Sequence, residues 1–354
     1  MGLGSAMTES KPAHSKTLPK AKGAFQSALV SWFVDHAEDY PWRRTRDPYA
    51  VLVSELMLQQ TQVATVLSRR YFERWLERFP DVHALARASE DAVLKAWEGL
   101  GYYRRARNLQ KAARIVAEEF DGEFPRTVES IQALPGVGRY TAGAVAAFAF
   151  DLPAPIVDAN VARVLARIFD FSMEIDLPRG QKQLWSWAEQ LVPAQSARSY
   201  NSGLMELGQK ICTSRQPKCF ECPVSAFCST RTPDQLPVKR PRTKTVVLDE
   251  HVVYMRDQQG RVMLEQEVGK RREGLWKLPA ASDPAKGEIL LKMPYSITHY
   301  RMTLFVHQGG VCNGGSDAET RGFSIDELQE IAMPSPYRKA LVALLENEDF
   351  ALSQ

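Results

Sequence analysis

The stretch LPGVGRYTAGAV, residues 134–145, predicts a short turn bracketed by Gly136 and Gly138 that leads directly into an apolar helix. Glycines let successive backbone N–H groups converge, and the helix that follows adds partial positive charge, so a phosphate is a natural ligand of such a turn. A tight helix–helix connection without any ligand has the same pattern. The rest of the sequence has to supply the context that separates these two interpretations.

Composition sets the broad class of the protein. The chain has 354 residues, of which 44% are hydrophobic and 25% charged, so it is long enough for about two or three globular domains. The 45 basic and 42 acidic residues give a net charge of +3, too small to indicate a polyanionic partner by itself. No apolar run of about eighteen residues and no secretory h-region occurs, so we expect an intracellular, cytoplasmic protein without a membrane partner.

The composition of the sequence and the spacing of its apolar residues change along the chain. Residues 1–22 are rich in Ser, Lys, Ala and Pro and predict a disordered leader, whereas residues 23–230 show the helical recurrence of apolar residues at intervals of three and four. Residues 231–245 include three prolines and five basic residues and predict an exposed linker. Residues 246–350 alternate as β-strands, with DQQG as a turn and a closing helix from Ser335 and Pro336. We therefore expect a mostly α N-terminal domain and a smaller α+β C-terminal domain.

Four cysteines lie close together near the end of the helical region. Cys212, Cys219, Cys222 and Cys228 enclose intervals of six, two and five residues, and only Cys312 lies outside this group. In an intracellular chain, such a cluster of thiols favours a metal site over disulfides. Zinc and iron–sulfur clusters both accept four thiolates. The single C-x-x-C flanked by two lone cysteines favours a [4Fe–4S] cluster, and zinc remains the alternative.

Two carboxylates precede or interrupt apolar helical patterns. Glu55 shares a predicted helix face with Val51, Leu52 and Leu58, and desolvation there would raise its pKa and keep a proton on it near neutral pH. Asp158 precedes an apolar helical stripe as a predicted N-cap, and the backbone N–H groups of a cap favour its ionised form. One protonated and one ionised carboxyl group suit the expulsion of a leaving group from a sugar. An exposed rim glutamate and an ordinary helix cap are the alternatives.

These motifs together resemble a known enzyme family. LPGVGRYTAG, VDANVARV and the cysteine loop resemble the helix-hairpin-helix DNA glycosylases that contain an iron–sulfur cluster. Within these enzymes, PWRRTRDPYAVLVSELMLQQTQV and WEGLGYYRRARNL look like the MutY-type adenine glycosylases. The resemblance implies a helix-hairpin-helix glycosylase fold with a [4Fe–4S] loop at residues 212–228. It also implies a monomer that flips and removes adenine mispaired with 8-oxoguanine or G in double-stranded DNA, by hydrolysis of the N-glycosidic bond.

The resemblance also implies roles for individual residues. Glu55 would protonate the adenine, and Asp158 would stabilise the sugar cation with Asn160 helping to orient the site. Base flipping would bring one nucleotide to these groups. The residues implied to contact DNA are Trp42 and Arg43 near the adenine pocket, Gln60 and Tyr102 in the base stack, and Gly136 and Gly138 on a phosphate.

Tyr140 stands at the exit of the glycine turn, where the related endonuclease III enzymes have a lysine nucleophile. A phenol cannot form a Schiff base with the sugar, whereas an amine can. The sequence therefore favours a monofunctional glycosylase that uses water. An endonuclease III-like glycosylase/lyase for oxidised pyrimidines and a non-catalytic iron–sulfur DNA-binding protein are the alternatives.

The C-terminal domain resembles the Nudix-like module with which MutY enzymes inspect the base opposite adenine. EGLWKLPA, residues 273–280, is similar to the Nudix strand, but the magnesium-binding acidic residues of Nudix hydrolases are missing after it, so diphosphate hydrolysis is not expected. The family reads 8-oxoguanine with a Phe-Ser-His loop. The matching residues here are Ile297, Thr298 and His299, so Thr298 and His299 retain the polar groups while the aromatic contact is lost.

Overall fold

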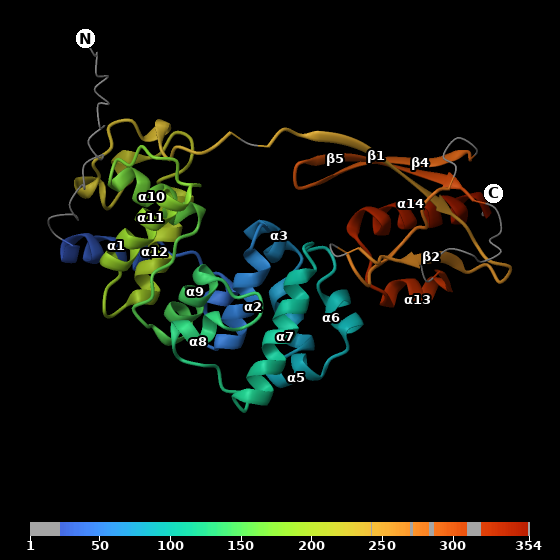
Figure 1. The fold of residues 1–354 in the computed structure, drawn as a ribbon, viewed down its shortest axis with the longest axis horizontal. Coiled ribbons are helices and arrows are strands. Elements are labelled where there is room, and N and C mark those ends of the chain that lie inside the picture. Colours follow the sequence, from blue (N-terminus) through green and yellow to red (C-terminus); the bar gives the residue numbers. More distant parts are fainter. Residues whose placement is uncertain (1–21, 242, 270–271, 283–286, 310–319, 353–354) are drawn as a thin grey trace, which may run out of the picture. The chain divides into compact units, whose positions relative to one another are not determined.

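The computed structural model describes residues 22–241, 243–269, 272–282, 287–309 and 320–352 (Figure 1). Residues 1–21, which make up nearly all of the predicted leader, and Cys312 lie outside these ranges. The chain divides into two compact units. Unit 1 comprises Met1–Glu38 and Ala146–Arg240, and unit 2 comprises Asp39–Val145 and Pro241–Gln354. The domain boundaries predicted from the sequence, at residues 22/23, 230/231 and 245/246, remain predictions.

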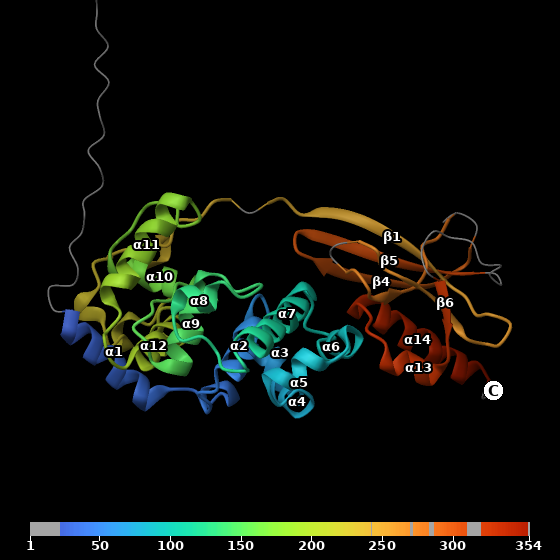
Figure 2. The same ribbon diagram turned by 60° about the horizontal axis from the view of Figure 1, so that its bottom comes forward.

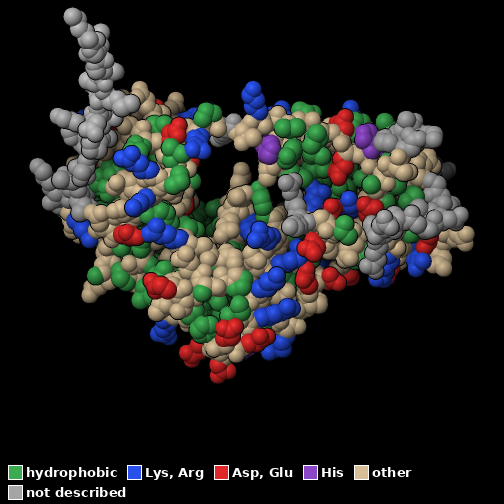
Figure 3. Space-filling view, viewed as in Figure 1, with side chains coloured by type: hydrophobic (Ala, Val, Ile, Leu, Met, Phe, Trp, Pro, Cys, Tyr) green, Lys and Arg blue, Asp and Glu red, His purple; other side chains and the backbone are tan. Residues whose placement is uncertain are grey.

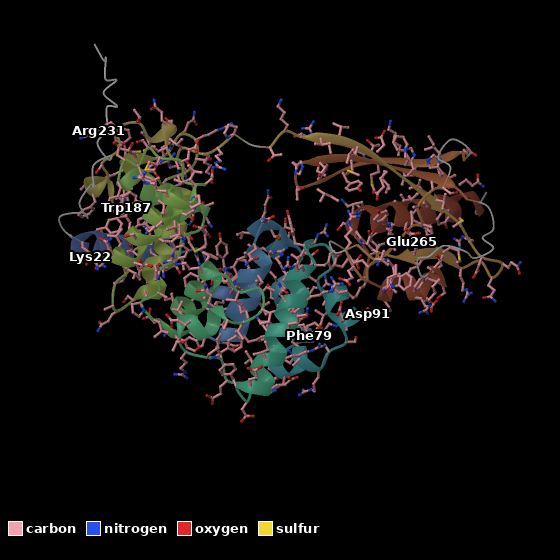
Figure 4. The ribbon with its side chains drawn as sticks, in the orientation of Figure 1. Lys22, Phe79, Asp91, Trp187, Arg231 and Glu265 are labelled. Carbon is pink, nitrogen blue, oxygen red and sulfur yellow. The ribbon has the colours of Figure 1, made fainter. Side chains whose placement is uncertain are left out.

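Unit 1 is helical within its described residues. Its helices are α1 (Lys22–His36), the second half of α9 (Arg139–Phe150), α10 (Ala159–Ile168), α11 (Pro178–Leu191) and α12 (Ala197–Lys210), followed by the short η2 (Cys219–Glu221), η3 (Ser225–Phe227) and η4 (Pro233–Gln235). Gly203 lets α1 approach α12 closely, because a Cβ there would lie 3.2 Å from Leu29 Cγ. Trp187, labelled in Figure 4, stacks on Phe169 with ring centroids 4.1 Å apart. These contacts form the apolar core of unit 1.

The first part of unit 2 consists of helices from the N-terminal half of the chain. They are η1 (Pro41–Arg43), α2 (Pro48–Leu58), α3 (Val63–Ser68), α4 (Tyr71–Arg78), α5 (Val82–Arg87), α6 (Glu90–Ala96), α7 (Arg104–Glu119), α8 (Val128–Gln132) and the start of α9. The sequence explains where α2 begins: the Asp47 side chain accepts hydrogen bonds from the backbone N–H groups of Tyr49 and Ala50, and Pro48 is the first residue. Phe79, labelled in Figure 4, packs edge-on against Trp75.

The second part of unit 2 is the smaller α+β region. Its elements are β1 (Val246–Tyr254), β2 (Val262–Gln266), β3 (Trp276–Lys277), β4 (Ile289–Ile297), β5 (Tyr300–Gln308), β6 (Thr320–Phe323), α13 (Ile325–Glu330) and α14 (Ser335–Leu352). One sheet has the strand order β1-β5-β4 and the other β3-β2-β6. Figures 1 and 2 show α14 beside the first sheet, where Leu341 and Leu344 join Leu304 and Val306 in one core.

The predicted fold class is confirmed, since helices dominate the N-terminal part and two small sheets with two helices follow. The DQQG turn also forms, with Gly260 N–H donating to Asp257 O at 3.0 Å and Gly260 in a left-handed conformation at φ 76°. The strands on either side of this turn nevertheless belong to different sheets, because β1 pairs in parallel with β5 along its whole length. Across the described ranges, the structure contains no helix both long and apolar enough to cross a membrane.

Candidate functional site

Glu55 lies on a helix that is buried on all sides. Residues 49–57 of α2 are all buried, and Glu55 itself is only 6% exposed. This is the apolar surrounding that the sequence predicts for it. A buried carboxyl group at such a position can exchange a proton with a group bound beside it.

Gln60 and Tyr102 are exposed residues in left-handed backbone conformations. Gln60 follows the end of α2 with φ 56°, and Tyr102 follows Gly101 with φ 48°. Both contribute to a cavity of about 450 Å³ that Arg104, Asn108 and Gly136 also line. The structure therefore brings two of the predicted DNA-contacting side chains and the glycine turn to one cavity of unit 2.

The glycine turn packs against α7. Gly136 has φ 77°, and a Cβ at this position would lie 2.6 Å from Cβ and Nδ2 of Asn108. Gly138 has no atom within 4 Å of such a Cβ and no left-handed φ. Gly136 is thus required by the backbone conformation and by the close approach of α7, while Gly138 leaves open space above the start of α9.

Tyr140 is the second residue of α9 and is half-buried. Its neighbour Thr141 is buried, and Thr141 Oγ1 accepts a hydrogen bond from Gln59 Nε2 at 3.2 Å. This bond ties the start of α9 to the end of α2. Tyr140 therefore lies at the start of a helix that is hydrogen-bonded to the end of α2, where Gln60 also lies.

Asp158 belongs to unit 1 and caps α10, as predicted. Its carboxylate accepts hydrogen bonds from Val161 N–H at 2.7 Å and from Asn160 Nδ2 at 3.0 Å, and Asn160 Oδ1 accepts from Arg163 Nη2 at 2.9 Å. The expectation that the cap keeps Asp158 ionised is opposed by the burial of its carboxyl group. Burial raises the pKa of Asp158 above its ordinary value, against the lowering effect of the hydrogen bonds from Val161 and Asn160.

The predicted metal ligands lie in the segment after α12. Cys212, Cys219, Cys222 and Cys228 are free thiols, and Arg167 Nη1 lies 3.3 Å from Cys212 Sγ. Burial, with a smaller effect of the neighbouring thiols, raises the pKa of Cys222 to about 11. In the part of the chain that the structure describes, no three His, Cys, Asp or Glu side chains are arranged to hold a metal ion. The chemistry of four thiols in one segment is what fits a cluster.

Trp42 and Arg43 form part of the short helix η1. Trp42 is buried, stacks on Tyr40 with ring centroids 5.1 Å apart, and meets Phe72 edge-on. The Arg43 guanidinium lies 4.7 Å from the centre of the Tyr40 ring. In this structure the Trp42 ring therefore contributes to the core of unit 2.

Thr298 and His299 form the turn that joins β4 to β5. Thr298 is exposed with φ 53°, and the His299 ring contacts Tyr300 at 4.1 Å between ring centres. A second cavity, of about 510 Å³, is lined by Tyr102, Ile297 and Thr298 together with Arg272 and Lys339. Tyr102 therefore lines both of these cavities.

Several residues at these cavities are not among the sequence predictions. Arg105 and Asn108 on α7 line the first cavity, and Arg272 and Lys339 line the second. On the face drawn in Figure 3, Lys and Arg side chains gather over the region of α7, whose sequence RRARNLQKAARIVAEE begins with three arginines among four residues. The density of arginine there is the sequence signal that indicates a role for α7.

Comparison with known proteins gives a consistent set of similarities. Residues 53–190 match the HhH-GPD superfamily base excision DNA repair protein family. The chain is 46% identical over 217 residues to an adenine DNA glycosylase of Homo sapiens, which covers 59% of this chain and 39% of that protein. It is 44% identical over 199 residues to an adenine DNA glycosylase of Mycolicibacterium smegmatis, covering 56% of this chain and 66% of that one.

A solved structure is also similar. A thermostable thymine-DNA glycosylase matches with a TM-score of 0.53 and 33% identity, over 59% of this chain and 96% of that one. The chain spans only about two fifths of the length of the human relative that it matches. The family match at residues 53–190 lies in the mostly helical part of the chain.

Proposed function

Because this chain belongs to the HhH-GPD superfamily of base excision DNA repair proteins, we propose that it is an adenine DNA glycosylase. Its substrate would be adenine mispaired with 8-oxoguanine or G in double-stranded DNA. The observation that carries the proposal is the buried Glu55 on α2, five residues before the exposed Gln60, inside the segment that matches the base excision DNA repair family. Adenine at neutral pH is a poor leaving group until a ring nitrogen is protonated, and a buried carboxyl group can supply that proton.

The proposed reaction is hydrolysis of the N-glycosidic bond. DNA is bound with the adenine flipped out of the stack, since the target atoms cannot be reached inside the duplex. Glu55 donates a proton to the base as the bond breaks. Asp158, held by Asn160 and the α10 N-terminus, stabilises the positive charge that develops on the sugar, and water completes the reaction. The raised pKa of Asp158 means that this group is ionised only above a pH higher than that of an ordinary aspartate.

The glycine turn and the exposed side chains around it are the proposed DNA-binding surface. Backbone N–H groups at Gly136 and Gly138 would bind a phosphate, which fixes the register of the duplex without reading its sequence. Gln60 and Tyr102 would enter the base stack at the position that the adenine leaves. Trp42 and Arg43 would support the adenine pocket, with Trp42 acting through the core in which it is buried.

The base opposite adenine would be inspected at the second cavity. Thr298 and Tyr102 line this cavity together, which supports a role for the β4–β5 turn in reading that base. Thr298 offers a hydroxyl group and the adjacent His299 an imidazole, and both can hydrogen-bond to the edge of a purine. The substitution of Ile297 for the family's aromatic residue removes a stacking surface from this turn.

Cys212, Cys219, Cys222 and Cys228 would hold a [4Fe–4S] cluster as thiolates. When bound, such a cluster joins four points of one loop and so supplies rigidity to the segment after α12. Its proposed contribution to the function is structural. Arg167, which lies against Cys212 Sγ and donates to the Thr213 carbonyl oxygen at 2.7 Å, would help to orient this segment.

A strand-specific assay tests the proposal. The purified protein is incubated with a labelled duplex containing A opposite 8-oxoguanine, and samples are analysed with and without hot alkali. We expect the labelled strand to break only after alkali, because Tyr140 cannot act as an amine nucleophile. Strand scission without alkali that borohydride traps would identify a glycosylase/lyase instead, and no break under either condition would indicate a DNA-binding protein without this activity.

A further inference from the structure

Arg105 is a buried arginine that connects two separate turns of unit 2. It is the second residue of α7 and is only 9% exposed. Its Nη1 atom donates to the carbonyl oxygens of Leu56, at 2.6 Å, and of Gln59, at the end of α2. Its Nη2 atom donates to the carbonyl oxygens of Leu100, at 2.9 Å, and Gly101, at 3.1 Å.

The two turns that Arg105 connects are those that present Gln60 and Tyr102. The carbonyl groups of Gln59 and Gly101 belong to the peptide bonds that lead into these two residues. Both residues have a left-handed backbone conformation. This conformation is unfavourable for residues other than glycine and persists only where the surroundings enforce it. One guanidinium group thus holds both of the unfavourable turns.

The guanidinium group of Arg105 also contacts two aromatic rings. Its central carbon lies 5.4 Å from the centre of the Trp97 ring and 5.5 Å from the centre of the Tyr102 ring. Arg105 therefore contacts the side chain of Tyr102 as well as the peptide bond that precedes it. A planar group with five donors can satisfy several acceptors and two rings at once, whereas the ammonium group of lysine cannot.

Burial of the charged Arg105 side chain costs free energy that burial of a neutral side chain would not cost. Its burial lowers its pKa to about 10. Within the described ranges, its hydrogen-bond partners are backbone carbonyl oxygens and the Thr61 hydroxyl group, and its buried Nε has no partner. No carboxylate among these partners offsets the desolvation of the charge, so stability alone does not explain why arginine occupies this position.

We propose that Arg105 is a positioning residue that fixes the backbones of Gln60 and Tyr102 before DNA binds. Both side chains then stand in the conformation in which they enter the base stack, and binding does not have to order them. Preformed contacts of this kind improve binding where the contacts are made and leave other DNA contacts unchanged. The part concerning the base stack rests on the proposed function, whereas the part concerning the two backbones does not.

The first test compares Arg105→Lys and Arg105→Gln with a matched control, Arg114→Gln. Arg114 lies on the same helix, is exposed, and donates to one carbonyl oxygen, that of Ala86. Backbone amide hydrogen exchange is followed in the segments 58–62 and 99–104. We expect exchange in both segments to accelerate by about tenfold or more in the Arg105 variants, and to stay at the wild-type rate in the control.

The second readout is DNA binding at one salt concentration. We expect the Arg105 variants to lose about tenfold in affinity for the A:8-oxoguanine duplex and to keep their affinity for an undamaged duplex, because Arg105 reaches the DNA only through Gln60 and Tyr102. Equal losses on the two duplexes, or unchanged exchange in either segment, would overturn the proposal. Absence of adenine excision by the wild-type protein, with the exchange result as expected, would overturn the proposed function alone.

A chemical rescue covers the case in which these variants fold poorly. Arg105 lines the cavity of about 450 Å³, so a small cation can reach the space left by Arg105→Ala. We expect millimolar guanidinium to restore slow exchange in both segments of this variant, and ammonium at the same concentration to have no effect. Restoration in one segment only, or by both ions alike, would contradict a bridging role.

Discussion

Replacement of Gly136 by alanine tests how the glycine turn is built. Gly136 has φ 77°, and alanine in a left-handed conformation costs about 1–2 kcal/mol. The new Cβ would also lie 2.6 Å from the Asn108 side chain, and overpacking of this kind costs about 1–3 kcal/mol more. Together, Gly136→Ala should lower the free energy of unfolding by about 2–5 kcal/mol.

A matched control lies two residues further along the same turn. Gly138 has no left-handed φ and no atom within 4 Å of the position that a Cβ would take, so Gly138→Ala should change the free energy of unfolding by less than about 0.5 kcal/mol. Addition of Asn108→Ala to Gly136→Ala removes the steric part and should recover about 1–3 kcal/mol, leaving the cost of the backbone conformation.

Urea unfolding of the four proteins measures these differences. Equal destabilisation by Gly136→Ala and Gly138→Ala would show that neither the backbone conformation nor the contact with α7 distinguishes the two glycines. No recovery in the double variant would refute the steric part alone. DNA affinity of Gly136→Ala should fall equally for matched and mismatched duplexes, because a phosphate contact positions DNA without reading its bases.

Three further predictions concern the other predicted sites. His299→Ala should weaken binding to A opposite 8-oxoguanine by about 1–3 kcal/mol and to A opposite G by less, and titration of both duplexes at one salt concentration checks this. Purified protein should contain about four iron atoms per chain, and Cys222→Ser should lower both the melting temperature and the DNA affinity; stoichiometric zinc without iron, in protein made anaerobically with ample iron, would contradict this prediction. Burial raises the pKa of Asp158, so the folded state favours its neutral form; this stabilisation is present below the unfolded pKa of about 3.9 and is lost as pH rises through the folded pKa. Melting temperatures of Asp158→Asn and wild type should therefore differ least near pH 3 and diverge towards pH 7 in favour of the variant.

The sequence predicts those features that depend on neighbouring residues. Asp47 and Pro48 fix the start of α2, and Asp158 caps α10, because a cap needs only the residues of its own first turn. The strands and the turn at Asp257–Gly260 also follow from local patterns. Such features can be predicted without knowledge of the tertiary contacts.

Features that depend on distant residues could not be predicted in this way. In the sequence, Arg105 is one member of a basic cluster. Its contacts with Leu56 and Gln59 could not be predicted, because these residues lie more than forty positions away. The parallel pairing of β1 with β5 joins strands about fifty residues apart, and no local pattern indicates it. The raised pKa of Asp158 also depends on the folded structure, since burial outweighs the local effect of the cap.

The release of free adenine is the decisive measurement for the proposed adenine glycosylase activity. A duplex containing A opposite 8-oxoguanine is incubated with excess protein, and adenine is measured by mass spectrometry for wild type and for Glu55→Gln. The wild-type protein should release one adenine per duplex, and Glu55→Gln should release it about 10²–10⁴ times more slowly while still binding the duplex. Absence of adenine from the wild-type reaction, or equal rates for the two proteins, would contradict the account.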